Sequence, residues 1–141
     1  MEGFLSQTAI DPRTVLAYGE TEYRVHGEPG FILLVDRPCA ELLAAHRRHG
    51  VGCSAFLTAC NPRSQRLDDD TNAARQAALA HELRGLVVLE GVGQHDQWPG
   101  EASFLVFGLD LEAAKALAER FEQNALVWSG ADGVPRLILL R

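Results

Sequence analysis

The apolar run at residues 54–60 constrains the fold of this chain most, because it stops abruptly at a polar cluster. The run reads SAFLTAC and continues directly into Asn61-Pro62-Arg63-Ser64-Gln65. A short apolar run bounded by turn residues is typical of a strand in the centre of a sheet. The sequence therefore predicts a core strand whose end brings polar side chains to one edge of the sheet.

Helical and strand-like segments follow one another irregularly along the rest of the chain. A short helix is expected to begin at Pro12, and three longer helices are expected at residues 38–48, 71–83 and 111–122. The expected strands cover residues 21–26, 31–35, 54–60, 86–90, 102–107, 125–128 and 135–140, with a loop at 91–100. This order predicts the α+β class, with a single mixed β-sheet of about six to seven strands and helices packed on it.

The connections between these segments predict which ends meet. Strands 54–60 and 86–90 flank a helix and should run parallel, and so should strands 102–107 and 125–128, while 102–107 returns antiparallel after the loop. One sheet edge then collects the end of strand 54–60, the start of helix 71–83 and the starts of the two later strands. The candidate residues there are Asn61, Arg63, Ser64, Asn72, Arg75, Glu101, Ser103, Gln123 and Asn124, with Trp98 and His95 on the nearby loop. Ligands of open α/β sheets often bind at such an edge.

Arg75 is the most unusual of these candidates. Helical spacing places it on the same stripe as Leu79 and Leu83, and an arginine on a core stripe needs a partner or a wet cavity. In one interpretation Arg75 binds an anionic group while Glu101 acts as general base or hydrogen-bond acceptor. In the other, the two form a structural ion pair that holds the loop onto the helix.

Composition limits the remaining options. The chain has 141 residues, which fits one domain with a core from about residue 10 to 140. Its net charge of -6 argues against non-specific nucleic-acid binding, although a small anionic ligand stays compatible. No segment is long and apolar enough to predict a membrane span, and the N-terminus lacks the pattern of a secretory signal, so we expect a cytoplasmic protein without membrane contact.

Neither a metal nor a cofactor is expected. Cys39, Cys53 and Cys60 are odd in number and lack CxxC spacing, so they are interpreted as small buried residues. Gly91-Val92-Gly93 lacks the third glycine of a dinucleotide fingerprint. Asp68 to Asp70 are interpreted as a solvated helix cap rather than a metal site. Ser64 or Ser103 would be a nucleophile only beside a base, and His95 is the sole histidine expected at this edge.

Several motifs together resemble a bacterial family, the domain of unknown function DUF3293. They are Ala17-Tyr18, Thr21, Tyr23, FLTACNPRSQ at 56–65, Asn72 with Arg75, WPGEASFLVFG at 98–108 and FEQNALVW at 121–128. The resemblance covers about Ile10 to Leu140, with two departures: Cys60 stands where an aromatic residue is expected, and Glu122 where glycine is expected. It implies no established activity.

Two functional hypotheses follow. In the first, the chain is a small-molecule-binding protein or a hydrolase- or transferase-like enzyme whose polar cleft takes a small polar or anionic ligand. Glu101 and Arg75 would then be catalytic, and the other edge candidates, including Trp98, would bind the ligand. In the second, the chain is a non-catalytic protein-interaction module, its partner unknown, in which the same side chains form a closed structural network. An incompletely paired Arg75 would favour the first hypothesis, and complete internal hydrogen bonding without a cavity would favour the second.

Overall fold

A computed structural model describes residues 8–96 and 98–141, although not the side chains of Trp98 and Pro99. The helices of this part are α2 (Pro12–Glu20), α3 (Ala40–Arg48), α4 (Asp69–Glu82) and α5 (Leu111–Arg120), with one 3-10 turn, η1 (Pro62–Ser64). The strands are β1 (Glu22–Val25), β2 (Phe31–Leu33), β3 (Ser54–Leu57), β4 (Val88–His95), β5 (Trp98–Phe107), β6 (Ala125–Ser129) and β7 (Pro135–Leu139). The predicted α+β class is confirmed.

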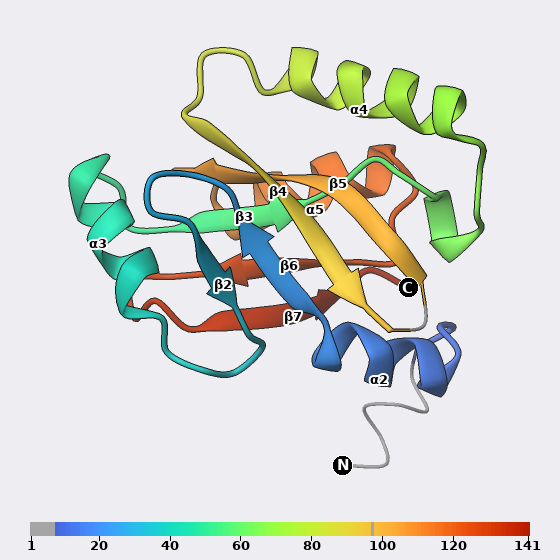
Figure 1. The fold of residues 1–141 in the computed structure, drawn as a ribbon, viewed down its shortest axis with the longest axis horizontal. Helices are drawn as coiled ribbons and strands as arrows, with labels where there is room; N and C mark the ends of the chain where they lie inside the picture. Colours follow the sequence, from blue (N-terminus) through green and yellow to red (C-terminus); the bar gives the residue numbers. More distant parts are fainter. Residues whose placement is uncertain (1–7, 97) are drawn as a thin grey trace.

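All seven strands belong to one sheet in the order β2-β1-β4-β5-β3-β6-β7 (Figure 1). The prediction of mixed pairing was wrong, because every hydrogen-bonded pair is antiparallel. The predicted directions are nevertheless right. β3 and β4 run the same way but are separated by β5, and β5 and β6 run the same way but are separated by β3. Each helical crossover therefore skips one strand, and the skipped position is filled by an antiparallel neighbour.

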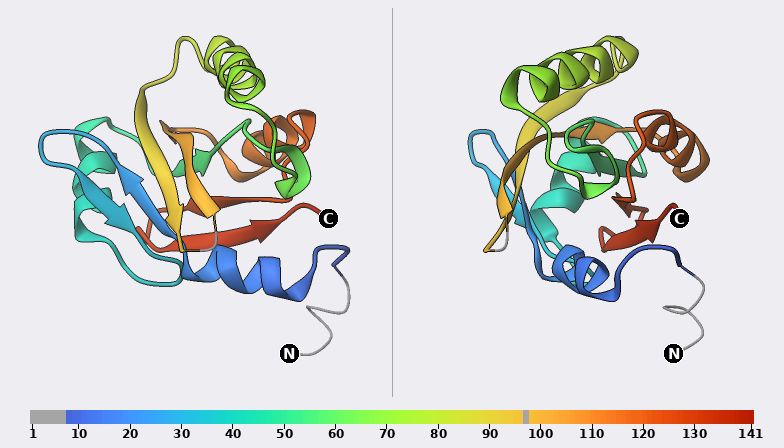
Figure 2. Two further views of the ribbon diagram at one scale, coloured as in Figure 1. Left: turned by 45° about the vertical axis from the view of Figure 1, so that its right-hand side comes forward. Right: turned by 90° about the vertical axis from the view of Figure 1, so that its right-hand side faces the viewer.

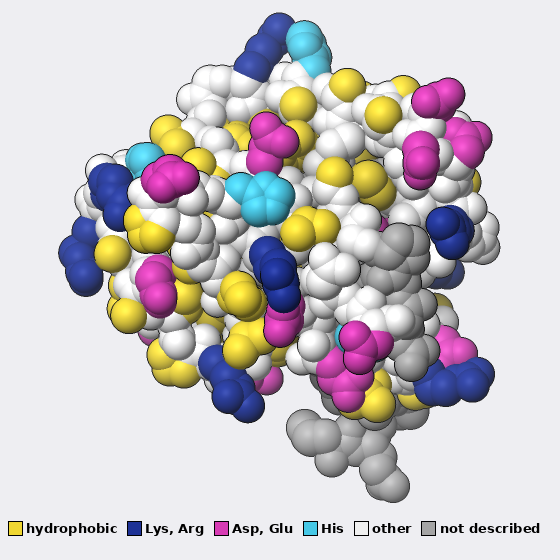
Figure 3. All heavy atoms as spheres, in the orientation of Figure 1, with side chains coloured by type: hydrophobic (Ala, Val, Ile, Leu, Met, Phe, Trp, Pro, Cys, Tyr) yellow, Lys and Arg dark blue, Asp and Glu magenta, His cyan; other side chains and the backbone are white. Residues whose placement is uncertain are grey.

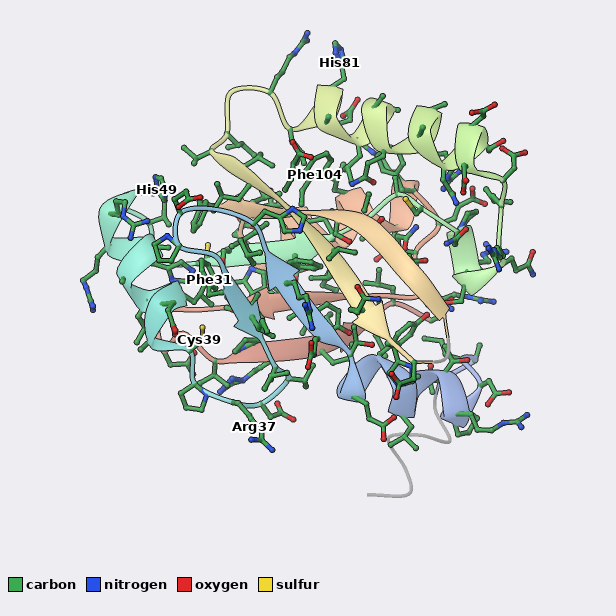
Figure 4. The ribbon with its side chains drawn as sticks, viewed as in Figure 1. Phe31, Arg37, Cys39, His49, His81 and Phe104 are labelled. Carbon is green, nitrogen blue, oxygen red and sulfur yellow. The ribbon has the colours of Figure 1, made fainter. Side chains whose placement is uncertain are left out.

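The sheet is curled, with β4 and β5 crossing β6 and β7 at a steep angle (Figure 2). Residues of α3 pack on one face, where Leu42 and Ala45 join a core with Phe56 and Phe107. Helices α4 and α5 cover the other face, where Leu79 and other helix residues join a second core. Phe104 of β5 is directed toward α4, while Cys39 and His49 mark the two ends of α3 (Figure 4).

The region predicted as a loop at 91–100 is mostly sheet, which corrects the sequence-based assignment. β4 continues to His95 and β5 begins at Trp98, so the two form a long hairpin. Gly91, which suggests a loop in the sequence, lies inside the sheet because the space for a side chain at this position is taken. At Gly91, a Cβ atom would lie 2.4 Å from the carbonyl oxygen of Arg24 and 2.9 Å from the ring of Phe56.

The polar starts of the helices follow the sequence signals. The carboxylates of Asp11, Asp68 and Asp110 accept hydrogen bonds from backbone N–H groups in the first turns of α2, α4 and α5. Such caps satisfy donors that a helix leaves unpaired. In the described part of the chain, no helix has the length and apolar character that would let it cross a membrane.

Candidate functional site

The polar residues expected at one sheet edge lie together there. The end of β3, the turn η1 and the first turns of α4 meet β5 and the connection from α5 to β6. Hydrogen bonds join side chains from these separate elements, as between Asn61 and Glu101 or between Ser64 and Asn124. Whether these residues bind a ligand remains a prediction.

Asn61 is the central connection of this edge. Its Nδ2 donates to Oε2 of Glu101 at 2.7 Å. Its Oδ1 accepts from Nδ2 of Asn72 at 2.8 Å and from the backbone N–H of Leu67 at 2.9 Å. Oδ1 of Asn72 in turn accepts from the backbone N–H of Asn61 at 2.9 Å. These bonds determine which end of the Asn61 amide faces Glu101, so Asn72 positions Glu101 through Asn61.

Arg75 does not pair with Glu101. Its Nε donates to the carbonyl oxygen of Ala59 at 2.7 Å, and a guanidinium nitrogen donates to that of Phe121 at 2.5 Å. Its nearest carboxylate is that of Glu122, at 3.6 Å. Arg75 therefore joins the end of β3 to the C-terminus of α5, where a cation suits the helix dipole. Neither interpretation of an Arg75–Glu101 partnership describes these contacts.

A second network lies beside α2. The hydroxyl groups of Tyr18 and Ser64 are hydrogen-bonded to each other, and Nδ2 of Asn124 reaches them at 3.1 and 3.3 Å. Oδ1 of Asn124 accepts from Arg141 at 3.1 Å. Gln123 is buried and donates through Nε2 to the carbonyl oxygens of Cys60 and Phe121. The network thus fastens η1 and the chain end to α2.

A cavity of about 60 Å³ opens between these two networks. Its polar lining consists of Tyr18, Thr21, Tyr23, Thr58, Asn61, Ser64, Glu101, Ser103 and Gln123, and its apolar lining includes Phe56, Leu57, Val127 and Leu137. A second cavity of about 270 Å³ lies on the α4 side and is lined in part by Asn72, Gln76 and Arg66. Asn61 and Glu101 line both cavities, so the hydrogen-bonded pair forms the boundary between them.

The smaller cavity results from a missing side chain. Tyr23, Gly93 and Glu101 are paired in one row across β1, β4 and β5. A Cβ atom at Gly93 would meet only Thr21 at 3.8 Å and Tyr23 at 3.9 Å, which is ordinary contact. Gly93 therefore leaves space between Tyr23 and Glu101, whereas the corresponding space at Gly91 is filled by Phe56.

Glu101 has an unusual environment for a carboxylate. Burial raises its pKa above the usual value, and the hydrogen bond from Asn61 opposes that shift only in part. Oε1 of Glu101 has no hydrogen-bond partner among the described residues. The fully buried, unpartnered side-chain N and O atoms in that part are His46 Nδ1 and Gln76 Nε2. Oε1 is therefore accessible to solvent and has no hydrogen-bond partner among the described residues.

The backbone is strained at the same edge. Positive φ angles occur at Asn61 (47°), Arg63 (54°), Ser64 (60°) and Glu122 (59°), and Asp36 is the fifth such non-glycine residue in the described chain. Asparagine tolerates this left-handed conformation, but it costs other residues roughly 1–2 kcal/mol. The left-handed φ at position 122 explains why the family resemblance leads us to expect glycine there, although this chain has Glu122.

The remaining candidates are less central. Arg63 is exposed, and Ser103 is buried and donates to the carbonyl oxygen of Glu101 at 3.0 Å. His95 lies 3.2 Å from Glu20. The Trp98 side chain lies outside the described residues. The candidate residues predicted from the sequence do not include Tyr18, Tyr23 or Gly93, although the two tyrosines belong to the family motifs.

Groups of metal-binding side chains are not found in residues 8–96 and 98–141, where no three His, Cys, Asp or Glu residues could hold an ion together. Burial raises the pKa of Cys60, which favours its thiol form.

On the face shown in Figure 3, Lys and Arg side chains are scattered among acidic ones rather than gathered in one patch.

Comparison with protein families gives one match. The family model described as a protein of unknown function, DUF3293, matches residues 57–126, about half of the chain. This segment begins in β3, ends in β6 and contains Asn61, Asn72, Arg75 and Glu101. Curated proteins and solved structures gave no match. The chain is therefore a member of the DUF3293 family, a family whose function is unknown.

Proposed function

We propose that the chain binds a small polar molecule in the cavity beside Gly93, with Glu101 as its main polar anchor. The observation that carries this proposal is that Glu101 lines this cavity while its Oε1 has no hydrogen-bond partner among the described residues. Oε1 is accessible, and a partly desolvated carboxylate oxygen gains free energy from a hydrogen-bond donor. A ligand would supply the missing partner, whereas a purely structural network would be expected to satisfy it internally.

The lining shapes the expected ligand. Apolar side chains such as Phe56 and Val127 would contact its body, and Glu101 would orient its polar end. Ligand sites commonly combine an apolar wall with a few polar groups in this way. Because burial raises the pKa of Glu101, the same carboxylate would suit a general base in a hydrolase- or transferase-like reaction. Catalysis, a bacterial source and a cytoplasmic location remain predictions of the sequence.

The second candidate function is the protein-interaction module, and Arg75 is the observation that favours it. Its hydrogen bonds to Ala59 and Phe121 are internal, so this arginine matches the feature expected of a structural network. Arg75 also does not line the cavity beside Gly93. The ligand site proposed above therefore does not depend on Arg75, and the two candidates make opposite predictions for the cavity.

A fragment screen by NMR tests the proposal. Backbone amide spectra of the wild-type chain are recorded with small polar fragments, and the same fragments are added to Gly93→Ala and Gly93→Val. We expect some fragments to shift the amide signals of Tyr23 and Ser103, and expect the valine substitution to abolish those shifts by filling the cavity. Absence of any fragment that shifts these amides, or shifts that persist in a folded Gly93→Val, would contradict the proposal.

A further inference from the structure

Four of the six hydroxyl groups that line the Gly93 cavity donate their protons to backbone carbonyl oxygens. Tyr23 donates to the carbonyl oxygen of Tyr18 at 2.6 Å, and Thr21 donates to that of Ala17 at 2.7 Å. Thr58 donates to the carbonyl oxygen of Ala102 at 2.7 Å, and Ser103 to that of Glu101 at 3.0 Å. A hydroxyl group has a single proton, so these four groups can offer a ligand only their oxygen lone pairs.

The side-chain amides of the lining show the same preference. Both contacts of Gln123 Nε2 are to backbone carbonyl oxygens, at 3.0 and 3.2 Å, while its Oε1 has no partner in the described part of the chain. Asn61 donates to Glu101 and accepts through Oδ1 from the protein. The groups that remain for a ligand are therefore mostly acceptors.

The charge of the lining adds to this preference. Glu101 is the one charged residue among the lining residues named for this cavity, which include no lysine, arginine or histidine. An anionic ligand would meet a carboxylate and oxygen lone pairs without a compensating cation, which is unfavourable. The rings of Tyr23 and Phe56, 5.3 Å apart, also line the cavity and would favour a nearby cation.

We infer that the ligand of this cavity carries a nitrogen cation, such as an amidinium or ammonium group, which donates to Oε1 of Glu101. This inference rests on the proposed function and names its ligand class. The volume of about 60 Å³ limits the enclosed part of the ligand to a small cationic head with a short apolar body. Burial raises the pKa of Glu101, and a cation bound beside it would lower that pKa again.

Three molecules of similar size and shape test the ligand class: acetamidinium, acetamide and acetate. Their dissociation constants are measured by NMR titration at pH 8 and constant ionic strength, a pH that favours the carboxylate form of Glu101. Acetamidinium can form a charge-assisted hydrogen bond with Glu101, whereas acetate has no donor and carries the same charge, so we expect acetamidinium to bind at least about tenfold more tightly than acetate, with acetamide between them. In Glu101→Gln this ratio should fall to about threefold or less.

Glu90→Gln is the matched control, because it removes one carboxylate from an exposed position on β4 that lines neither described cavity. It should leave the ratio unchanged. Tighter or equal binding of acetate, an unchanged ratio in Glu101→Gln, or no binding by acetamidinium would overturn the inference. Acetate binding that disappears in Gly93→Val would overturn the cationic ligand class while leaving the proposed cavity site intact. Binding of all three that persists in Gly93→Val would overturn both.

Discussion

Replacement of Arg75 by alanine should destabilise the protein strongly. The side chain is 23% exposed and donates two hydrogen bonds to backbone carbonyl oxygens. Hydrogen bonds from a charged donor contribute about 1.5–3 kcal/mol each, and partial solvation of the freed carbonyl groups keeps the sum near the lower end. The ion pair with the half-exposed Glu122 adds about 0–1 kcal/mol. We therefore expect a loss of about 3–5 kcal/mol.

The assay is thermal and urea unfolding of the wild type and a set of position-75 variants. For a chain of this length, about 3–4 °C of melting temperature corresponds to 1 kcal/mol, so Arg75→Ala should melt about 9–20 °C lower. Arg75→Met keeps much of the apolar stem without the donors and should lose nearly as much. Arg75→Lys restores the charge and some donation, and should fall between alanine and wild type.

Arg84→Ala is the control, because Arg84 is exposed near the end of α4. It should change stability by less than about 0.5 kcal/mol. If Arg75→Ala melts within about 2 °C of this control, the two carbonyl bonds contribute little and the structural assignment of Arg75 is refuted. Arg75 would then be available for a ligand, as the first sequence interpretation supposed.

Three further tests use substitutions in and near this edge. Glu101→Gln should raise the melting temperature at pH 8 but not near pH 4. Burial raises the pKa of Glu101 in the folded protein above 4.5, so its contribution to stability is greatest below that value and is lost as pH rises through the folded pKa. Glu90→Gln should show no such difference, and the reverse result would contradict the burial of Glu101. Glu122→Gly should stabilise the chain by about 0.5–1 kcal/mol in urea unfolding, because glycine adopts the left-handed φ of 59° without strain. A destabilisation would show that the ion pair of Glu122 outweighs the strain. Gly91→Ala should cost about 3 kcal/mol through the contacts at 2.4 and 2.9 Å, whereas Gly93→Ala should stay within about 0.5 kcal/mol in the same assay; equal effects would contradict the assigned packing.

The fold class and the strand directions could be predicted because they depend on local signals. Apolar runs, caps and crossover connections determine whether a segment is a strand and which way it points. Pairing depends instead on which strand fills the space beside another, and this requires knowledge of tertiary packing. Hence β3 and β4 were correctly oriented, but the insertion of β5 between them could not be read from their connection.

The site was predictable in position more than in detail. Helical spacing places Arg75 on the sheet side of α4, but it cannot show that carbonyl groups at the end of α5 lie within reach. The cavity was missed because Gly91 and Gly93 both resemble loop residues in sequence. Only the structure distinguishes them, since Phe56 fills the space at one and nothing closer than 3.8 Å approaches the other.

The two functional hypotheses apply to different residues of the same edge. Arg75, Asn72 and Asn61 use their side chains on internal partners, so they behave as the structural network of the second hypothesis. Asn61 and Asn72 hold Glu101 at the boundary of two cavities, with one of its oxygens hydrogen-bonded to Asn61. A network that served stability alone would gain by pairing or neutralising that carboxylate. Under the proposed function, Asn61 and Asn72 position Glu101 for a ligand, and the titrations of wild type and Glu101→Gln test that role.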